Sequence, residues 1–140
     1  MVKIASADAI ETSSNSYTDL VTDHFMWPRN VGAMPDADGI GSGGDPECGD
    51  SLTIYIKVKD NIIEDISFLV FGCVAAIATS SITTELAKGK TLDEASKITD
   101  ADITEALGGL PENKLHCSLL GATALKEAIR NYYEKNNICG

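Results

Sequence analysis

Hydrophobic and polar residues alternate in two neighbouring stretches of the chain, residues 51–58 and 62–71. The alternating apolar positions are Leu52, Ile54, Ile56 and Val58 in the first stretch and Ile66, Phe68 and Val70 in the second. Between them, Asp60-Asn61 supplies a turn. Because a period of two places apolar side chains on one face, the pattern predicts an antiparallel hairpin with one covered face. Residues 36–45, which are rich in glycine, add either a third strand or a loop.

Elsewhere the apolar positions recur every three or four residues, which predicts helices. The first helix begins at a capping box, Ser16 to Asp19, and ends at Trp27-Pro28. The expected later helices cover residues 74–87, 92–97, 100–107 and about 117–135, the second of them starting at a Thr91/Glu94 capping box. The expected fold class is α+β: a small antiparallel sheet of about three strands, with helices packed on one face and a long C-terminal helix.

Composition narrows the classes of protein that the chain can represent. With 140 residues, 44% of them hydrophobic, it fits a single compact domain over residues 17–140, preceded by a polar tail, residues 1–16, that we expect to be disordered. The formal net charge of −10 repels phosphate backbones and anionic lipid, so we expect neither nucleic-acid nor membrane partners. No apolar run approaches the roughly 20 residues of a membrane span, and no secretory signal is present, so we expect a cytoplasmic protein.

Three of the four cysteines lie at predicted element junctions. Cys48 precedes the first hairpin strand, Cys73 follows the second, and Cys117 starts the last helix, whereas Cys139 lies beyond it and has no expected role. In the cytoplasm such cysteines serve metal or catalytic chemistry more often than disulfides. A helix N-terminus stabilises the thiolate, the form that binds metal or attacks, so we expect lowered thiol pKa values at Cys73 and Cys117.

These three cysteines are spread over about 70 residues, so they can form one site only if the fold brings them together. Asp50 and His116 would then join them. Soft sulfur ligands select zinc, copper(I) or iron–sulfur centres, and a carboxylate in the fourth place suits a site that releases its contents.

Simpler interpretations remain open for the same residues. The cysteines can be unrelated buried thiols, Asp50 a turn residue and His116 a helix cap. A cysteine hydrolase, with Cys117 or Cys73 as nucleophile, His116 as base and Asp50 orienting it, is a further alternative. His24 lies on the apolar stripe of the first helix, where a hydrogen-bonded core histidine is expected.

Several motifs together resemble the U-type iron–sulfur cluster assembly scaffolds, the IscU proteins and the N-terminal domain of NifU. The resemblance covers about residues 17–135. The motifs are Asp23-His24-Phe25, Pro28-Arg29-Asn30-Val31-Gly32, Cys48-Gly49-Asp50, Phe71-Gly72-Cys73, Ala75-Ala76-Ile77-Ala78-Thr79-Ser80-Ser81, Lys88-Gly89-Lys90 and Lys114-Leu115-His116-Cys117-Ser118.

The resemblance implies a scaffold, not an enzyme, on which a labile [2Fe–2S] cluster is built from iron and from sulfur delivered by a cysteine desulfurase of the IscS/NifS type. The cluster then passes to apo iron–sulfur proteins. The family's cluster ligands fall on Cys48, Cys73 and Cys117, with His116 or Asp50 as the fourth contact, and its first persulfide acceptor falls on Cys117. Whether one chain or a homo-oligomer holds the cluster is left open, and zinc can occupy the same ligands without a cluster.

The chain also departs from the family pattern. Leu110-Pro111-Glu112-Asn113-Lys114 stands where many members have Leu-Pro-Pro-Val-Lys, the peptide that a dedicated Hsp70-type chaperone binds, so the resemblance does not carry that partner. A zinc-containing sulfur-acceptor branch lacks the histidine and has an insertion before the last cysteine, which His116 and the short Gly108-Gly109 connection disfavour. Because zinc can use the same ligands, the alternative function is still a zinc-dependent sulfur acceptor or a zinc-binding protein.

Overall fold

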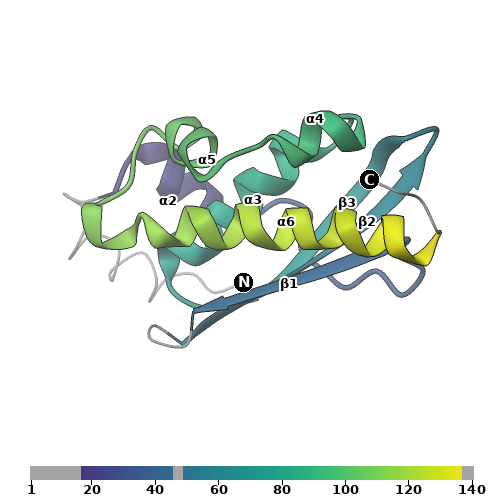
Figure 1. Cartoon of the computed structure of the whole chain (residues 1–140). Helices are drawn as coiled ribbons and strands as arrows, with labels where there is room; N and C mark the ends of the chain where they lie inside the picture. The colour runs from purple at the N-terminus through teal and green to yellow at the C-terminus, as the bar shows by residue number, and fades with distance from the viewer. Residues whose placement is uncertain (1–16, 46–48, 137–140) are drawn as a thin grey trace.

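A three-stranded antiparallel sheet forms one layer of the fold (Figure 1). This computed structural model describes residues 17–45 and 49–136. The strands follow the order β1-β2-β3, with β1 at Gly39–Asp45, β2 at Asp50–Lys59 and β3 at Ile62–Phe71. The expected α+β class is confirmed, and the glycine-rich segment left open above forms the strand β1.

The β2–β3 hairpin forms where the alternating pattern predicts it. Asp60 and Asn61 both have positive φ, 55° and 64°, as a two-residue hairpin turn with the right twist requires. Leu52, Ile54 and Ile56 are each at most 1% exposed, because they all point to the face that the helices cover.

Helices form the second layer. They are α2 (Asp19–Met26), α3 (Val74–Ala87), α4 (Leu92–Ser96), α5 (Asp100–Ala106), the short 3₁₀ helix η2 (Glu112–Lys114) and α6 (His116–Lys135). The long helix α6 runs beside β1 along most of the molecule (Figure 1). Within the described part of the chain, no helix combines the length and apolarity needed to cross a membrane.

The helix starts show which capping predictions hold. The Thr91/Glu94 capping box at α4 is confirmed, with both reciprocal hydrogen bonds present. The capping box expected from Ser16 to Asp19 is wrong, because the N-cap of α2 is Thr18, whose hydroxyl accepts from the Val21 N–H at 3.1 Å. Asp19 is therefore the first helical residue, where its charge favours the helix N-terminus.

Helix α6 packs directly on the backbone of β1. A Cβ added at Gly41 would stand 2.1 Å from the Ala128 nitrogen and 2.3 Å from the Ala124 oxygen, and one at Gly39 would stand 2.4 Å from the Ala128 oxygen. The alternate glycines of β1 and the alanines of α6 thus let the two elements approach closely. This contact fixes where the first residues of α6 lie relative to the end of the sheet.

Helix α3 crosses the middle of the helical layer and is buried on most of its sides. Apolar residues recur at helical spacing in its sequence, at Val74, Ile77, Ala78, Ile82 and Leu86, but Ala, Ser and Thr residues on other faces are buried as well. The hydroxyls of Ser80 and Thr83 donate to backbone carbonyls one turn earlier, at 2.7 and 2.6 Å. Small residues that satisfy their own polar groups let neighbours pack around the whole helix.

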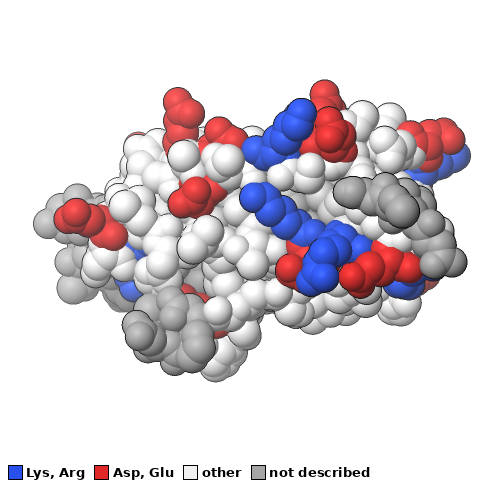
Figure 2. Space-filling view, in the orientation of Figure 1, with Lys and Arg blue, Asp and Glu red and all other residues white. Residues whose placement is uncertain are grey.

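Charge is mixed on the face of the molecule seen in Figure 2. Basic side chains gather over α4 and α6, with acidic ones interleaved among them (Figure 2). Lys97 pairs with Asp93 at 3.3 Å, and Arg130 pairs with Glu127 and with Glu134. Lys97 and Arg130 are thus partly neutralised by carboxylates of α4 and α6.

Candidate metal centre

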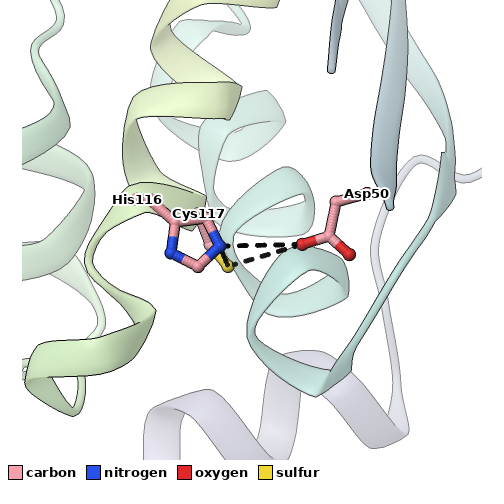
Figure 3. Close-up of side chains that lie close together, drawn as sticks. All are labelled: Asp50, His116 and Cys117. Atoms are coloured by element: carbon pink, nitrogen blue, oxygen red, sulfur yellow. Dashed lines mark hydrogen bonds and ion pairs between the residues drawn. The ribbon is translucent and has the colours of Figure 1, made fainter. Parts of the chain in front are cut away.

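Side chains from three separate segments meet at one end of the molecule. Asp50 is the first residue of β2, Cys73 is the N-cap of α3, and His116 and Cys117 are the first two residues of α6. Figure 3 shows Asp50, His116 and Cys117 pointing toward one another from β2 and α6. Cys48 and Cys139, by contrast, lie outside the described residues.

The separations within this cluster are longer than hydrogen bonds between nitrogen and oxygen. Cys73 Sγ lies 3.9 Å from Cys117 Sγ, and Asp50 Oδ2 lies 4.0 Å and 3.9 Å from these two sulfurs. His116 Nε2 lies 3.7 Å from Cys117 Sγ and 3.9 Å from Asp50 Oδ2. In a tetrahedral site with metal–sulfur bonds of about 2.3 Å, neighbouring sulfurs stand about 3.8 Å apart. The spacing therefore fits donors arranged around a common metal position.

Ligand atoms of Asp50, His116 and Cys117 all lie within 4.8 Å of one another, a grouping that could hold a metal ion. Cys117 is fully buried and Asp50 is 6% exposed, whereas the His116 side chain is 30% exposed. Cys73 is also partly exposed. The cluster thus has a closed side at Cys117 and Asp50 and an accessible side at His116 and Cys73.

Two helix N-termini contribute to the electrostatics of the cluster. Neither α3 nor α6 has a side-chain capping hydrogen bond at its N-cap. The N-terminal partial positive charge favours anions at Cys73 and Cys117. At the start of β2, Gly49 has a φ of +74°, a conformation that turns the chain into Asp50.

The two thiols respond differently to this environment. A hydrogen bond from Cys117 lowers the pKa of the Cys73 thiol to about 5, with burial opposing and the Ala76 N–H and Lys114 supporting the shift. The pKa of the Cys117 thiol is raised, first by that same hydrogen bond to Cys73, then by burial and by the charges of Cys73 and Asp50. The expected lowering of the thiol pKa is therefore right for Cys73 and wrong for Cys117. The first negative charge resides on the more exposed sulfur.

Two further residues lie at this cluster. Tyr17 packs against Ala75, Ala76 and Cys117, and burial raises the pKa of its hydroxyl although Lys114 acts to lower it. Burial acts to lower the pKa of Lys114, but the charges of Cys73, Tyr17 and Cys117 outweigh it and leave that pKa raised. Lys114 belongs to one of the motifs given above, whereas none of those motifs contains Tyr17. Tyr17 lies before α2 and 100 residues from Cys117, so no local spacing indicates its place.

The geometry does not suit the cysteine hydrolase alternative with Cys117 as the nucleophile. In a nucleophile–base–acid relay, the nucleophile contacts one imidazole nitrogen and the acid contacts the other. Here Cys117 Sγ and Asp50 Oδ2 both approach His116 Nε2, at 3.7 and 3.9 Å. The imidazole therefore does not stand between thiol and carboxylate, and the three donors face a common point instead.

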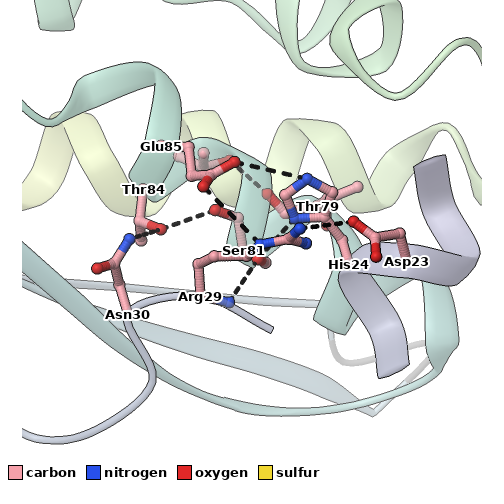
Figure 4. Close-up of polar contacts among 9 residues, drawn as sticks. Asp23, His24, Arg29, Asn30, Thr79, Ser81, Thr84 and Glu85 are labelled. Carbon is pink, nitrogen blue, oxygen red and sulfur yellow. Dashed lines mark hydrogen bonds and ion pairs between the residues drawn. The ribbon is translucent and has the colours of Figure 1, made fainter. Parts of the chain in front are cut away.

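A second histidine cluster lies between α2 and α3 (Figure 4). His24 is 3% exposed, and its Nδ1 lies 2.7 Å from Ser81 Oγ, which also accepts the Arg29 backbone N–H at 2.9 Å. His24 Nε2 lies 3.6 Å from Glu85. Arg29 pairs with Asp23 and with Glu85, but Arg29 Nη1 is buried without a hydrogen-bond partner among the described residues. The expected core histidine is confirmed. Ser81 is 0% exposed, so no substrate can reach its hydroxyl.

Comparison with known proteins identifies the family. The family described as "NifU-like N terminal domain" matches residues 16–139, nearly the whole chain. The chain therefore belongs to the NifU-like N-terminal domain family. The motifs and the fold had suggested the same class.

Named relatives agree with this assignment. The chain is 64% identical over 120 residues to the iron-sulfur cluster assembly scaffold protein IscU 1 of Archaeoglobus fulgidus, covering 86% of this chain and 78% of the relative. It is 49% identical over 124 residues to the iron-sulfur cluster assembly scaffold protein IscU of Escherichia coli, covering 86% of this chain and 96% of the relative.

Solved structures share the fold. The N-terminal part of a nitrogen-fixing NifU-like protein from Brucella abortus superposes with a TM-score of 0.69 at 20% identity, over 88% of this chain and 98% of that one. A putative iron-sulfur cluster assembly scaffold protein for the SUF system of Fervidobacterium islandicum gives a TM-score of 0.66 at 24% identity, over 81% and 96%. At these identities the likeness concerns the fold alone.

Proposed function

We propose that this protein is a scaffold on which a labile [2Fe–2S] cluster is assembled from iron and desulfurase-derived sulfur and then passed to apo-proteins. The observation that carries the proposal is the convergence of Asp50, Cys73, His116 and Cys117: for every pair except Cys73 and His116, donor atoms lie 3.7–4.0 Å apart. The IscU names of the relatives support the same function.

The proposed cluster ligands are Cys48, Cys73 and Cys117, with His116 or Asp50 as the fourth contact. Thiolates are the usual ligands of iron–sulfur clusters, and Cys48 stands two residues before Asp50 in the sequence. Asp50 Oδ2 lies within 4.0 Å of the Cys73 and Cys117 sulfurs, and His116 Nε2 lies 3.7 Å from the Cys117 sulfur, so either residue can be the fourth contact.

In the proposed assembly, Cys117 receives sulfur as a persulfide. Because the pKa of the Cys117 thiol is raised, it must first give up its proton, for which the Cys73 thiolate 3.9 Å away is the acceptor. The Cys117 thiolate then attacks the terminal sulfur of the desulfurase persulfide, a new S–S bond forms, and the desulfurase cysteine leaves as a thiolate. The transferred sulfur then needs two electrons from a thiol or other external reductant to become sulfide. Since Cys117 is fully buried, a desulfurase must approach from the side of Cys73 and His116, where the cluster is accessible.

Asp50 suits the proposed release of the cluster. A carboxylate is a hard ligand, and it binds soft metal centres less firmly than a thiolate would. Replacing it removes that weak member of the set and leaves the sulfurs as the dominant ligands. We therefore expect Asp50→Ala to lengthen the lifetime of the assembled cluster several-fold, with Asp65→Ala, on the exposed side of β3, as the control.

The function is tested by anaerobic reconstitution with ferrous iron, cysteine, a cysteine desulfurase and dithiothreitol. Visible charge-transfer bands that require all four additions, and an apo-ferredoxin that acquires the cluster afterwards, are the expected results. A protein that takes up iron without inorganic sulfide would contradict the proposal.

The alternative is a zinc-dependent sulfur acceptor or a zinc-binding protein. The grouping of Asp50, His116 and Cys117 favours it, because nitrogen, oxygen and sulfur donors are the ligands of zinc sites. The same reconstitution distinguishes the two functions. A chain that binds one zinc tightly, accepts persulfide sulfur and stays colourless would be a zinc-dependent acceptor.

A further inference from the structure

Gly72, directly before the N-cap Cys73, leaves the space in which the Asp50 carboxylate stands. A Cβ added at Gly72 would lie 2.7 Å from Asp50 Oδ1 and 2.9 Å from Asp50 Cγ. It would also lie 2.9 Å from Ala76 Cβ. Such distances are shorter than van der Waals contact, so any other residue at this position forces a neighbour to move.

The requirement for glycine here is steric. Gly72 is not among the glycines with positive φ, so its backbone does not itself demand glycine. Gly49, which directly precedes Asp50, differs in this respect. Its φ is +74°, and a Cβ added there would meet nothing within 4 Å. The two glycines that flank the carboxylate thus serve different purposes.

The two oxygens of Asp50 have different neighbours. Oδ1 lies over Gly72, and Oδ2 lies 4.0 Å from Cys73 Sγ and 3.9 Å from Cys117 Sγ. Asp50 is 6% exposed, so the carboxylate has little room to move outward. The missing side chain at Gly72 is therefore what allows a carboxylate to enter a cluster otherwise composed of two helix-terminal thiols and an imidazole.

We propose that Gly72 is a positioning residue that places the Asp50 carboxylate among the metal-binding donors and thereby determines whether the site has an oxygen ligand. The inference rests on the proposed function, because it concerns the ligands of the same site. Gly72→Ala should displace the carboxylate and leave the thiols and His116 in place.

Gly44 supplies a matched control close to the same residue. A Cβ at Gly44 would lie 3.5 Å from the Asp50 backbone oxygen, an ordinary contact, and Gly44 does not have a positive φ. Gly44→Ala therefore adds the same methyl group near Asp50 without touching its carboxylate.

Cobalt(II) is the spectroscopic probe of the first experiment, with the metal added anaerobically to the full-length protein. The ligand-field bands report the donor set, and the thiolate-to-cobalt bands report the sulfurs. We expect the ligand-field bands of Gly72→Ala to match those of Asp50→Ala, and those of Gly44→Ala to match the parent protein. A Gly72→Ala spectrum identical to that of the parent would overturn the inference.

Thermal unfolding without added metal gives the second measurement. Gly72→Ala should lower the melting temperature by about 5 °C in the parent protein and by less than half of that in an Asp50→Ala background. The added methyl group contacts Ala76 in both backgrounds, so this contact cancels when the two losses in melting temperature are compared. Equal losses in the two backgrounds would overturn the inference. If Gly72→Ala alone does not fold, recovery of folding by Asp50→Ala supports it, and failure to recover refutes it.

Neither measurement uses iron, sulfide or a desulfurase. A protein that fails to assemble a cluster but shows the cobalt and melting results would refute the proposed function and keep the role of Gly72. The opposite outcome would refute the role of Gly72 alone.

Discussion

The two histidines of this protein occupy opposite kinds of polar cluster. His24 lies in the protein interior, with Ser81 Oγ 2.7 Å from its Nδ1. His116 lies at a partly exposed end of the fold, with Cys117 and Asp50 at 3.7 and 3.9 Å from its Nε2. Both clusters contain an imidazole, a carboxylate and an oxygen or sulfur donor, so residue types alone do not distinguish them.

The difference lies in distance and in direction. Around His24, Ser81 Oγ meets Nδ1 at hydrogen-bond length and Glu85 faces the other ring nitrogen, Nε2, so different ring nitrogens contact different partners, as in a structural network. Around His116, lone pairs of several residues face one point at the spacing of metal ligands. A short, paired contact holds elements together, whereas a longer, convergent one leaves room for an ion.

The largest expected effect of a single substitution is on metal binding. Cys73→Ser should weaken zinc binding by about 100-fold or more, since one of about four ligands that together supply about 10–16 kcal/mol is lost. Serine is a good N-cap, so the free energy of unfolding without metal should stay within about 1 kcal/mol of the parent value. A competition titration against a chromophoric chelator measures the affinity.

Cys139→Ser is the control for that substitution, because Cys139 lies beyond the last predicted helix and has no expected role. Equal losses of zinc affinity in the two variants would mean that the cluster at α3 and α6 is not the metal site.

Sequence patterns predict the elements of this fold better than they predict the site. Alternation and the Asp60-Asn61 turn predict the hairpin because both act within a few residues. The approach of Cys117 to Cys73 and Asp50 depends instead on α6 seating against the glycines of β1, a contact between segments about 80 residues apart. Such a contact has no local signal. The junction positions singled out three cysteines, but only the family resemblance indicated that they lie together.

Helix α3 is a second case in which the sequence pattern predicts the element but not its surroundings. Its period predicts a helix with one apolar stripe, but nearly the whole helix is buried because its serines and threonines bond their own backbone. The hydroxyl of Ser81, in this helix, pairs with His24 and with the Arg29 N–H, and residue type alone does not reveal those partners.

Breaking the His24 cluster should affect stability and leave metal binding unchanged. Ser81→Ala removes the partner of His24 Nδ1 and of the Arg29 N–H, so two buried polar groups lose a hydrogen bond. We expect the free energy of unfolding to fall by about 2–3 kcal/mol, measured by chemical denaturation. Zinc affinity should remain within about twofold of the parent value.

Ser80→Ala is the matched control, because Ser80 is equally buried in the same helix but donates only to the Ala76 carbonyl. Its loss should stay below about 1 kcal/mol. If Ser80→Ala destabilises as much as Ser81→Ala, the His24 contacts contribute nothing beyond ordinary packing.

The His24 cluster should also make stability depend on pH. Burial, followed by the charge of Arg29, lowers the pKa of His24 below its ordinary value of 6.5, and Glu85 and Asp23 only partly oppose this. The unfolded chain therefore binds a proton near pH 6.5 that the folded protein does not, so stability present above pH 6.5 is lost as the pH falls. The slope reaches at most about 1.4 kcal/mol per pH unit.

Denaturation curves between pH 7.5 and pH 5.5 measure this slope, and His24→Gln should remove most of it while keeping a neutral, hydrogen-bonding side chain. A variant that keeps the full slope would assign the proton to another group.

The smallest expected effect separates the two contacts of His24. Glu85 lies 3.6 Å from His24 Nε2, and its side chain is 43% exposed, so water screens its charge. Glu85→Gln should change the free energy of unfolding by no more than about 0.5 kcal/mol at pH 7.5, where His24 is neutral. At lower pH the Glu85 carboxylate favours the protonated His24 ring, so Glu85→Gln should increase the loss of stability as the pH falls. Equal losses for Glu85→Gln and Ser81→Ala at pH 7.5 would mean that the contact with Glu85 holds His24 in place as much as the Ser81 hydroxyl does.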